Sequence, residues 1–266
     1  LNPSSAASDV YKRQGYIKFN YDEQIVKWAE CAKEKGSEIL ANPDQLREWL
    51  QCEGTWFVGV DVLPNDTGGG FYKVKLPNVF SNFMDKINVK PYHKAQLSVI
   101  YPGYPRPRRG DSKSAFEYRL KRDAAHVDGL LPVGAQKRRY LIEPHGVILG
   151  VPLNNTHPGA SPVVVWKGSH RIMRQEFSKI LSNVPPSDWK NIDLTETYKN
   201  ARRQCFESCE RTLINSPVGT GYALHPLLLH GITPWFSAKQ GTESLNRQVA
   251  YFRPLLNNVQ DWLKIC

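Results

Sequence analysis

The chain has 266 residues, of which 41% are hydrophobic and 23% charged, a composition typical of a folded globular protein rather than a disordered chain. Five scattered cysteines without a Cys-x-x-Cys pair argue against a disulfide framework or a zinc ribbon, and they favour a reducing, cytoplasmic location. The net charge of +10 indicates anionic partners, and no apolar run has the length of a membrane span or a signal-peptide core.

The first residues, Leu1 to Gln14, are rich in Ser and Ala and carry no periodic pattern. We interpret residues 1–14 as a non-native or disordered leader. The length of residues 15–266 fits one large domain better than two small ones.

Two helices are predicted near the N-terminus. Apolar residues with helical i, i+3, i+4, i+7 spacing predict an amphipathic helix from Asp22 to about Gly36, with a buried stripe of Ile25, Trp28, Ala29 and Ala32. Asn42 is a good N-cap and Pro43 suits the first helical position, so a second helix should follow at once. Both helices should pack on the outside of the segments that come next.

Strand patterns follow. The segments 56–62, 71–76 and 94–101 are candidate strands, and the Pro- and Gly-rich segment 102–110 predicts a long loop. The glycine triplet at 68–70 is interpreted as a plain turn, because no Lys-Ser/Thr pair and no helix follow it.

The second half of the chain contains further predicted strands and two predicted helices. Segments 144–153 and 161–166 are predicted as two adjacent antiparallel strands, followed by a helix over 172–181 and a polar helix over about 194–209. The last third returns to strands at 211–216, 221–229 and 247–253. The region lacks a regular strand–helix alternation, so we predict a mainly β fold with flanking helices, an antiparallel sandwich or barrel rather than a doubly wound sheet.

The segment around His126 carries the clearest candidate chemistry. In an extended strand His126 and Asp128 point to the same face, where an imidazole and a carboxylate can reach one ion. A third ligand from a distant segment would complete the 2-His-1-carboxylate site that holds ferrous iron and leaves positions open. Taken alone, the triplet also fits a polar turn before Gly129.

Four motifs in order carry a resemblance. They are His126-Val127-Asp128, Trp166-Lys167-Gly168-Ser169-His170, Leu229-His230-Gly231 and Arg247. In this order they resemble the phytanoyl-CoA dioxygenase-like family of iron(II)/2-oxoglutarate-dependent dioxygenases, over residues 92–254. The resemblance implies a double-stranded β-helix, also called a jelly roll or cupin-like fold.

The resemblance also implies roles for individual residues. It makes His126, Asp128 and His230 the Fe(II) ligands, Arg247 the anchor of the distal 2-oxoglutarate carboxylate, and Gln96 a further contact of that co-substrate. A guanidinium suits a carboxylate because its planar fork of donors matches two oxygens. The segment between His230 and Arg247 is longer than is usual in the family, so Arg253, of the same strand parity, is the alternative anchor.

The remaining histidines are interpreted as structural or as ordinary polar residues. His225, which precedes Pro226, has a structural role, and His170 is expected to shape the Gly-Ser-His turn. No motif supports a role for His93, His145 or His157.

The family's activity is the oxidation of a small-molecule substrate with O₂ and 2-oxoglutarate and the release of succinate and CO₂. Asp128 favours hydroxylation, because related halogenases lack this carboxylate. Between Arg106 and Arg139 the chain has ten basic and four acidic residues, which would steer an anionic substrate or form a solvated basic face. Nucleic acid is disfavoured as a partner because no recognition motif accompanies the charge.

Two other readings remain open. A cupin-like metal-binding protein or enzyme that does not use 2-oxoglutarate would share the fold, but it would not need Arg247. A catalytically inactive binding module would also share it, but such a module is not expected to keep a complete His/Asp/His set.

Overall fold

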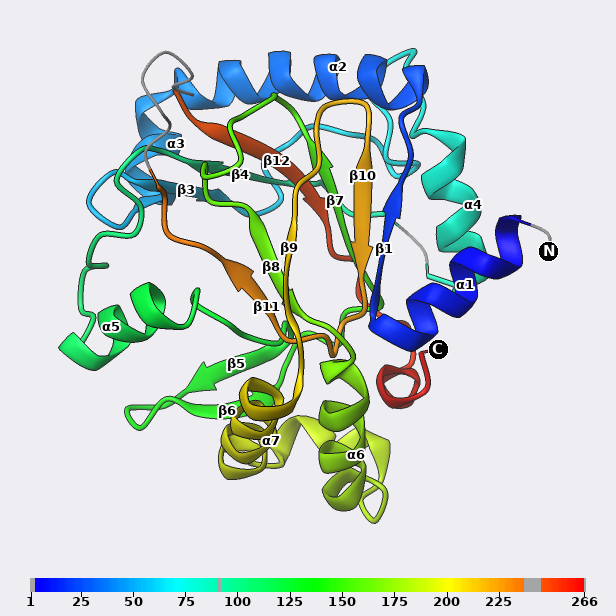
Figure 1. Ribbon diagram of the computed structural model, residues 1–266, viewed down its shortest axis with the longest axis vertical. Coiled ribbons are helices and arrows are strands. Elements are labelled where there is room, and N and C mark those ends of the chain that lie inside the picture. The colour runs from blue at the N-terminus through cyan, green and yellow to red at the C-terminus, as the bar shows by residue number, and fades with distance from the viewer. Residues whose placement is uncertain (1–2, 90–91, 237–244, 266) are drawn as a thin grey trace.

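The computed structural model describes residues 3–89, 92–236 and 245–265. Its centre is a pair of antiparallel sheets, one with seven strands in the order β1-β10-β7-β12-β4-β3-β2 and one with three in the order β11-β8-β9 (Figure 1). A separate hairpin, β5-β6, lies below them. From β7 onwards the chain crosses repeatedly between the sheets: β7, β10 and β12 lie in the large one, β8, β9 and β11 lie in the small one, and β8 and β9 follow each other in the same sheet. These repeated crossings are the arrangement of a jelly roll.

The strands are short and the helices lie outside the sheets. The strand bounds are β1 Tyr16–Phe19, β2 Leu50–Gln51, β3 Trp56–Gly59, β4 Gln96–Ile100, β5 Leu130–Val133, β6 Arg138–Leu141, β7 Ile148–Pro152, β8 Val163–Trp166, β9 Arg211–Ile214, β10 Gly221–Leu224, β11 His230–Ile232 and β12 Arg247–Phe252. The helix bounds are α1 Pro3–Gln14, α2 Glu23–Leu40, α3 Pro43–Trp49, α4 Asn78–Lys86, α5 Lys113–Lys121, α6 Ser169–Leu181 and α7 Thr195–Ser208, with two 3₁₀ turns, η1 Pro186–Asn191 and η2 Val259–Leu263.

Successive side chains of β12 point alternately into the barrel and toward its outer face. Val249 and Tyr251 pack with residues of the small sheet, whereas Ala250 and Phe252 pack on the side of α2. Successive side chains of a strand point to opposite faces. Arg247 and Arg253 therefore share the parity of Val249 and Tyr251, which faces the space between the two sheets.

The long helix α2 covers the outer face of the large sheet (Figure 1). Trp28 is fully buried there, and its indole N–H donates to the carbonyl of Gly69 over 2.8 Å. The helix continues through Gly36, where the sequence predicted its end, and reaches Leu40. A Cβ atom at Gly36 would lie 3.3 Å from Leu97 of β4, so the absence of a side chain lets the helix pack closely on the sheet.

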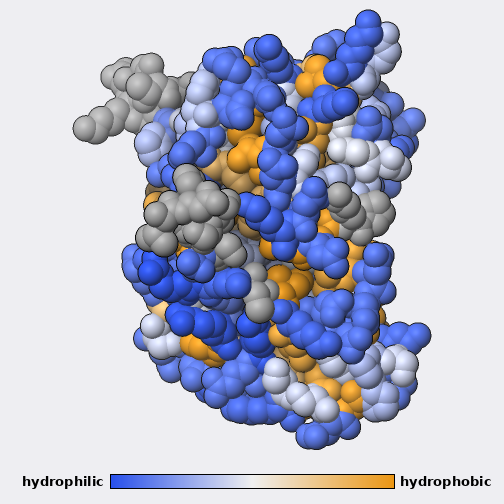
Figure 2. Space-filling view, turned by 90° about the vertical axis from the view of Figure 1, so that its right-hand side faces the viewer, coloured by the Kyte–Doolittle hydropathy of each residue, from blue (hydrophilic) through white to orange (hydrophobic). Residues whose placement is uncertain are grey.

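At the end of the molecule opposite α2, helices α6 and α7 pack together over a second core (Figure 1). Phe177 of α6 stacks on Trp262 of η2, with ring centroids 5.3 Å apart. The face shown in Figure 2 is mostly hydrophilic, with smaller hydrophobic patches between the hydrophilic side chains. None of the helices among the described residues is both long enough and apolar enough to cross a membrane.

The structure corrects two predictions about local elements and adds two helices. Segments 144–153 and 161–166 do contain strands, but β7 and β8 belong to different sheets and are not neighbours. Segment 71–76 is not a strand, because Phe71 and Val74 exchange backbone hydrogen bonds within one tight turn. Helices α4 and α5 were not predicted.

The segment set apart as a leader is helical over residues 3–14. Tyr11 is buried, with its ring 5.3 Å from that of Phe83 and 5.8 Å from that of His225. The described residues 3–14 are thus helical, and the interpretation of residues 1–14 as a leader stays a prediction.

Candidate metal centre

Three of the residues singled out from the sequence meet at one place. His126 and His230 face each other across an isolated β-bridge, in which each backbone N–H donates to the other's carbonyl over 2.8 and 3.0 Å. Asp128 lies beside them, with Oδ1 3.1 Å from Nε2 of His126 and 3.8 Å from Nε2 of His230. One potential ligand atom from each residue lies within 4.8 Å of the others, close enough for all three to reach one metal ion.

Backbone carbonyls orient both imidazoles. Nδ1 of His126 lies 2.9 Å from the carbonyl oxygen of Ala124, and Nδ1 of His230 lies 2.9 Å from that of Leu228. Because a carbonyl only accepts hydrogen bonds, each Nδ1 carries a proton and Nε2 is the nitrogen left to bind a metal ion. Burial lowers the pKa of His126, but the hydrogen bond between its Nε2 and Asp128 outweighs burial and raises this pKa, so a metal ion would displace the proton of that Nε2. A histidine that donates its other ring N–H in this way is typical of metal sites.

The charges at the cluster also suit a metal. Burial disfavours the charged form of Asp128, but its hydrogen bond to His126 and the nearby positive charges outweigh burial and hold the pKa of this carboxyl well below its usual range. Burial lowers the pKa of His230 to about 4, so this ring is neutral near pH 7. An ionised carboxylate and a neutral imidazole are the forms that bind metal ions.

An unusual turn delivers His126 to the cluster. Asp123 and Ala124 have φ angles of +53° and +51°, and Arg211 clamps the Asp123 carboxylate through two hydrogen bonds of 2.8 and 3.0 Å. The Asp123 carbonyl accepts from the N–H of Ile232, and a Cβ atom at Gly231 would lie 2.1 Å from that oxygen. Only glycine fits directly after His230, so this turn and β11 lock together.

The Gly-Ser-His segment acts through Ser169. Its hydroxyl accepts the N–H of Leu229 over 2.8 Å, while the Leu229 carbonyl accepts from Trp166 over 2.9 Å. These two contacts fix the residue before His230 on the end of β8. His170 lies elsewhere: its Nε2 is 3.0 Å from the carbonyl of Lys12 and its ring packs against His225.

Arg247 lies at the wall of a cavity of about 230 Å³ that Asn154, His157 and Tyr222 also line. The guanidinium is buried and contacts the hydroxyls of Tyr222 and Tyr251, which lie 2.9 Å from each other. Its Nη1 finds no hydrogen-bond acceptor among the described residues. A buried donor without a partner is costly and indicates a place for an acceptor, here an anion.

The two remaining sequence candidates lie on the same inner face. Gln96 is buried on β4 directly opposite Tyr251. Arg253 follows β12, and its Nη1 lies 3.4 Å from Oδ2 of Asp128. The structure thus brings Arg253 to the metal cluster, whereas Arg247 lines a cavity.

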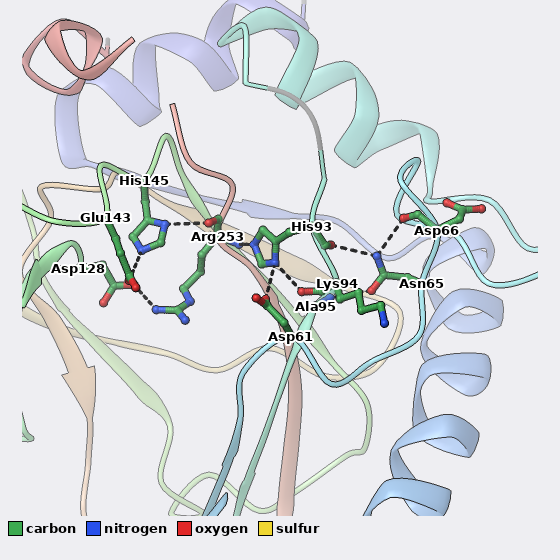
Figure 3. Close-up of polar contacts among 10 residues, drawn as sticks. All are labelled: Asp61, Asn65, Asp66, His93, Lys94, Ala95, Asp128, Glu143, His145 and Arg253. Atoms are coloured by element: carbon green, nitrogen blue, oxygen red, sulfur yellow. Dashed lines mark hydrogen bonds and ion pairs between the residues drawn. The ribbon is translucent and has the colours of Figure 1, made fainter. Parts of the chain in front are cut away.

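Sequence reasoning missed the partners of Arg253. The backbone N–H of Arg253 donates to Nε2 of His93 over 2.8 Å, and its carbonyl accepts from Nδ1 of His145 over 2.7 Å (Figure 3). Both histidines were interpreted as ordinary polar residues. No local pattern could have found these contacts, because 160 and 108 residues of chain separate the partners.

Only the comparison with solved structures finds similar proteins. No family model and no curated protein matches the sequence. Among solved structures, the chain is similar to the non-heme α-ketoglutarate-dependent carbocyclase SnoK from nogalamycin biosynthesis, with 12% identity over 98% of this chain and 89% of that one and a TM-score of 0.50. It is equally similar to the α-ketoglutarate-dependent epimerase SnoN of the same biosynthesis, with 12% identity over 95% of this chain and 82% of that one and a TM-score of 0.50.

At this identity the likeness concerns the fold. It confirms the jelly roll predicted from the sequence and, at the level of fold, the predicted similarity to enzymes that use 2-oxoglutarate, which is another name for α-ketoglutarate. The chain therefore has the jelly-roll fold of these two α-ketoglutarate-dependent enzymes.

Proposed function

We propose that this protein is an iron(II)/2-oxoglutarate-dependent dioxygenase. The observation that carries the proposal is the cluster of His126, Asp128 and His230, whose ligand atoms lie within 4.8 Å of one another. The fold supports it, because the solved structures with this arrangement of strands include α-ketoglutarate-dependent enzymes.

The donor set fits ferrous iron. Two imidazole Nε2 atoms and one carboxylate form the 2-His-1-carboxylate set typical of non-heme iron oxygenases, and it leaves open positions for other ligands. When bound, Fe(II) would supply the chemistry that oxidises the substrate with O₂, coupled to the conversion of 2-oxoglutarate to succinate and CO₂. The part of the protein is to hold both histidines in one tautomer and Asp128 in its ionised form.

Arg247 is the proposed anchor of the distal 2-oxoglutarate carboxylate. Its buried Nη1 lacks a partner among the described residues, and the hydroxyl of Tyr251, which accepts from that of Tyr222, is a further donor beside it. An anion at this place would be held by charge-assisted hydrogen bonds, the stronger kind. Gln96, opposite Tyr251, would add a polar contact from the same inner face.

Hydroxylation of a small organic substrate is the proposed outcome, because Asp128 fills the iron position that a halide would otherwise take. An anionic substrate has weaker support than the net charge suggests. Arg106 faces Glu53 at 3.7 Å and Arg138 faces Asp193 at 3.0 Å, while Arg119 forms an ion pair with Asp111. Carboxylates thus neutralise part of the basic segment locally.

Turnover of 2-oxoglutarate tests the proposal. Purified protein is mixed with Fe(II), ascorbate and 2-oxoglutarate in air, and succinate is quantified against time. We expect succinate formation that depends on Fe(II), is lost in Asp128→Ala, and in Arg247→Gln needs a higher concentration of 2-oxoglutarate. A protein that binds Fe(II) but neither binds nor consumes 2-oxoglutarate would instead be the cupin-like metal protein.

A further inference from the structure

We propose that Arg253 is a positioning residue for the metal ligand Asp128, held in place by His93 and His145. The inference rests on the proposed metal site and goes beyond it. Arg253 would then orient a metal ligand rather than bind the co-substrate. His93 and His145, which no sequence motif supports, would hold the backbone of Arg253.

The two oxygens of Asp128 face different partners. Oδ1 lies toward the histidines, 3.1 Å from Nε2 of His126, whereas Oδ2 lies 3.4 Å from Nη1 of Arg253. Asp128 is 8% exposed, so water provides little alternative solvation for Oδ2. With Oδ2 held by the guanidinium, the carboxylate presents a single oxygen to the metal. Hydrogen bonds to ligating carboxylates commonly orient them in this way.

Arg253 itself is fixed by side chains rather than by a neighbouring strand. Strand β12 ends at Phe252, which pairs with Leu149 of β7, and the ladder does not include the next residue. His93 and His145 instead take the backbone N–H and carbonyl of Arg253 (Figure 3). These contacts, with the bond from the N–H of Gly146 to the carbonyl of Pro254, hold the backbone beyond the end of the strand, and the Arg253 side chain reaches Asp128.

Each histidine faces a carboxylate on its far side. Nδ1 of His93 lies 2.8 Å from Oδ1 of Asp61, and because its Nε2 accepts from Arg253, Nδ1 carries the ring proton. Nε2 of His145 lies 3.3 Å from Oε2 of Glu143 without a hydrogen bond between them (Figure 3). The contact with Asp61 fixes the orientation of the His93 ring, and the Arg253 carbonyl fixes that of the His145 ring.

The same segment also reaches Asp128 from its other side. The backbone N–H of Glu143 donates to the carbonyl of Gly129, the residue after Asp128, over 3.2 Å. A Cβ atom at Gly129 would lie 2.3 Å from the Glu143 carbonyl, so the approach requires glycine. Residues 143–145 thus contact both the residue after Asp128 and the backbone of Arg253, while the side chain of Arg253 contacts Asp128 itself.

Electrostatics provides a way to recognise a positioning role. A cation beside a metal site repels the metal ion, so loss of Arg253 should strengthen metal binding if only its charge mattered. If Arg253 instead holds the carboxylate in the binding orientation, its loss should weaken metal binding. The two explanations therefore predict changes of opposite sign.

The experiment is a titration with Co(II), a spectroscopic substitute for Fe(II), in the absence of 2-oxoglutarate and at pH 7.5. The visible d–d bands of bound Co(II) report both affinity and ligand geometry. For Arg253→Met we expect affinity about 10-fold or more below that of wild type, with altered bands, as for other outer partners of metal ligands. Arg253→Lys should fall between the two, and His93→Ala should change affinity in the same direction by less.

Two arginine variants serve as controls. Arg47→Gln removes the same charge at a side chain that is 76% exposed and paired with Asp44, and it should leave Co(II) affinity unchanged. Arg247→Gln should also leave binding of the metal alone unchanged, because its proposed partner is the co-substrate. Thermal unfolding of each variant verifies that it is folded. If Arg253→Met does not fold, the Co(II) affinity of Arg253→Lys is compared with that of wild type instead.

The outcomes separate this inference from the proposed function. If wild-type protein does not bind Co(II) through the three ligands, the proposed metal site itself is wrong. If wild type binds Co(II) and Arg253→Met, or Arg253→Lys where it decides, binds equally or more tightly, the metal site stands and the positioning role of Arg253 is overturned.

Discussion

The hydroxyl of Ser169 accepts the backbone N–H of Leu229 over 2.8 Å, one residue before the candidate metal ligand His230. Both groups are buried. The first turn of α6 therefore supports the start of β11 directly, and this contact links the Gly-Ser-His motif to the metal cluster.

Replacement of Ser169 by alanine should leave the Leu229 N–H buried without an acceptor. We expect the free energy of unfolding to fall by about 1–3 kcal/mol, together with weaker metal binding. Urea unfolding of the metal-free protein and a Co(II) titration measure the two effects. Ser182→Ala, at an exposed position after the same helix, is the matched control and should change neither. Unchanged stability in Ser169→Ala would contradict the supporting role.

Asp128→Ala should abolish measurable metal binding, because it removes a ligand and leaves two neutral imidazoles. Loss of an outer partner alone reduces metal affinity about 10- to 100-fold, so loss of the ligand should exceed about 100-fold. Equilibrium dialysis with Fe(II) under anaerobic conditions measures it. Asp44→Ala, at an exposed position in α3, should bind as wild type does. Retained binding in Asp128→Ala would show that the ion lies elsewhere.

Arg247→Gln should weaken 2-oxoglutarate binding without weakening metal binding. A hydrogen bond to a charged group contributes about 1.5–3 kcal/mol, which corresponds to a rise of about 10- to 100-fold in the KM for 2-oxoglutarate. Tyr222→Phe should raise that KM by less, since it removes a neutral hydroxyl that contacts Arg247 and Tyr251 rather than a charged contact to the co-substrate. If instead Arg253→Met raises the KM for 2-oxoglutarate while its Co(II) affinity stays at the wild-type value, Arg253 is the anchor and the assignment must be exchanged.

His170 should make stability depend on pH. Burial lowers the pKa of His170 to about 4, and nearby Arg174 and Arg171 also lower it. The unfolded chain takes up this proton near pH 6.5, before the folded one does, so stability is complete above pH 6.5 and falls as the pH drops toward 4. The loss should reach roughly 3 kcal/mol by pH 4. Urea unfolding of metal-free wild type and His170→Asn across this range isolates the contribution as the difference between them. A difference that does not change with pH would contradict it.

The sequence predicted those elements whose signals are local. The N-cap Asn42 with Pro43 gave α3, and the apolar stripe around Trp28 gave α2. Helix α5 was missed because it buries no residue and so has no apolar stripe. Helix α4 did carry a signal, since Phe80, Phe83 and Met84 have helical spacing and are buried.

Pairing between strands could not be read from the sequence. Strands β7 and β8 were predicted as strands but placed side by side. Two apolar segments joined by a loop are also the sequence pattern of a β-hairpin. In a jelly roll such a loop crosses from one sheet to the other. The cluster of His126, Asp128 and His230 was predicted through a resemblance in motif order, whereas the contacts of His93 and His145 with Arg253 depend on packing alone.

The most direct test of the account is the visible spectrum of the anaerobic protein with Fe(II) before and after addition of 2-oxoglutarate. Chelation of the iron by 2-oxoglutarate should produce a weak charge-transfer band in wild type. The band should be absent in His230→Ala, and in Arg247→Ala it should need far more 2-oxoglutarate. No band in wild-type protein that has bound Fe(II) would contradict the assignment as an iron(II)/2-oxoglutarate-dependent dioxygenase.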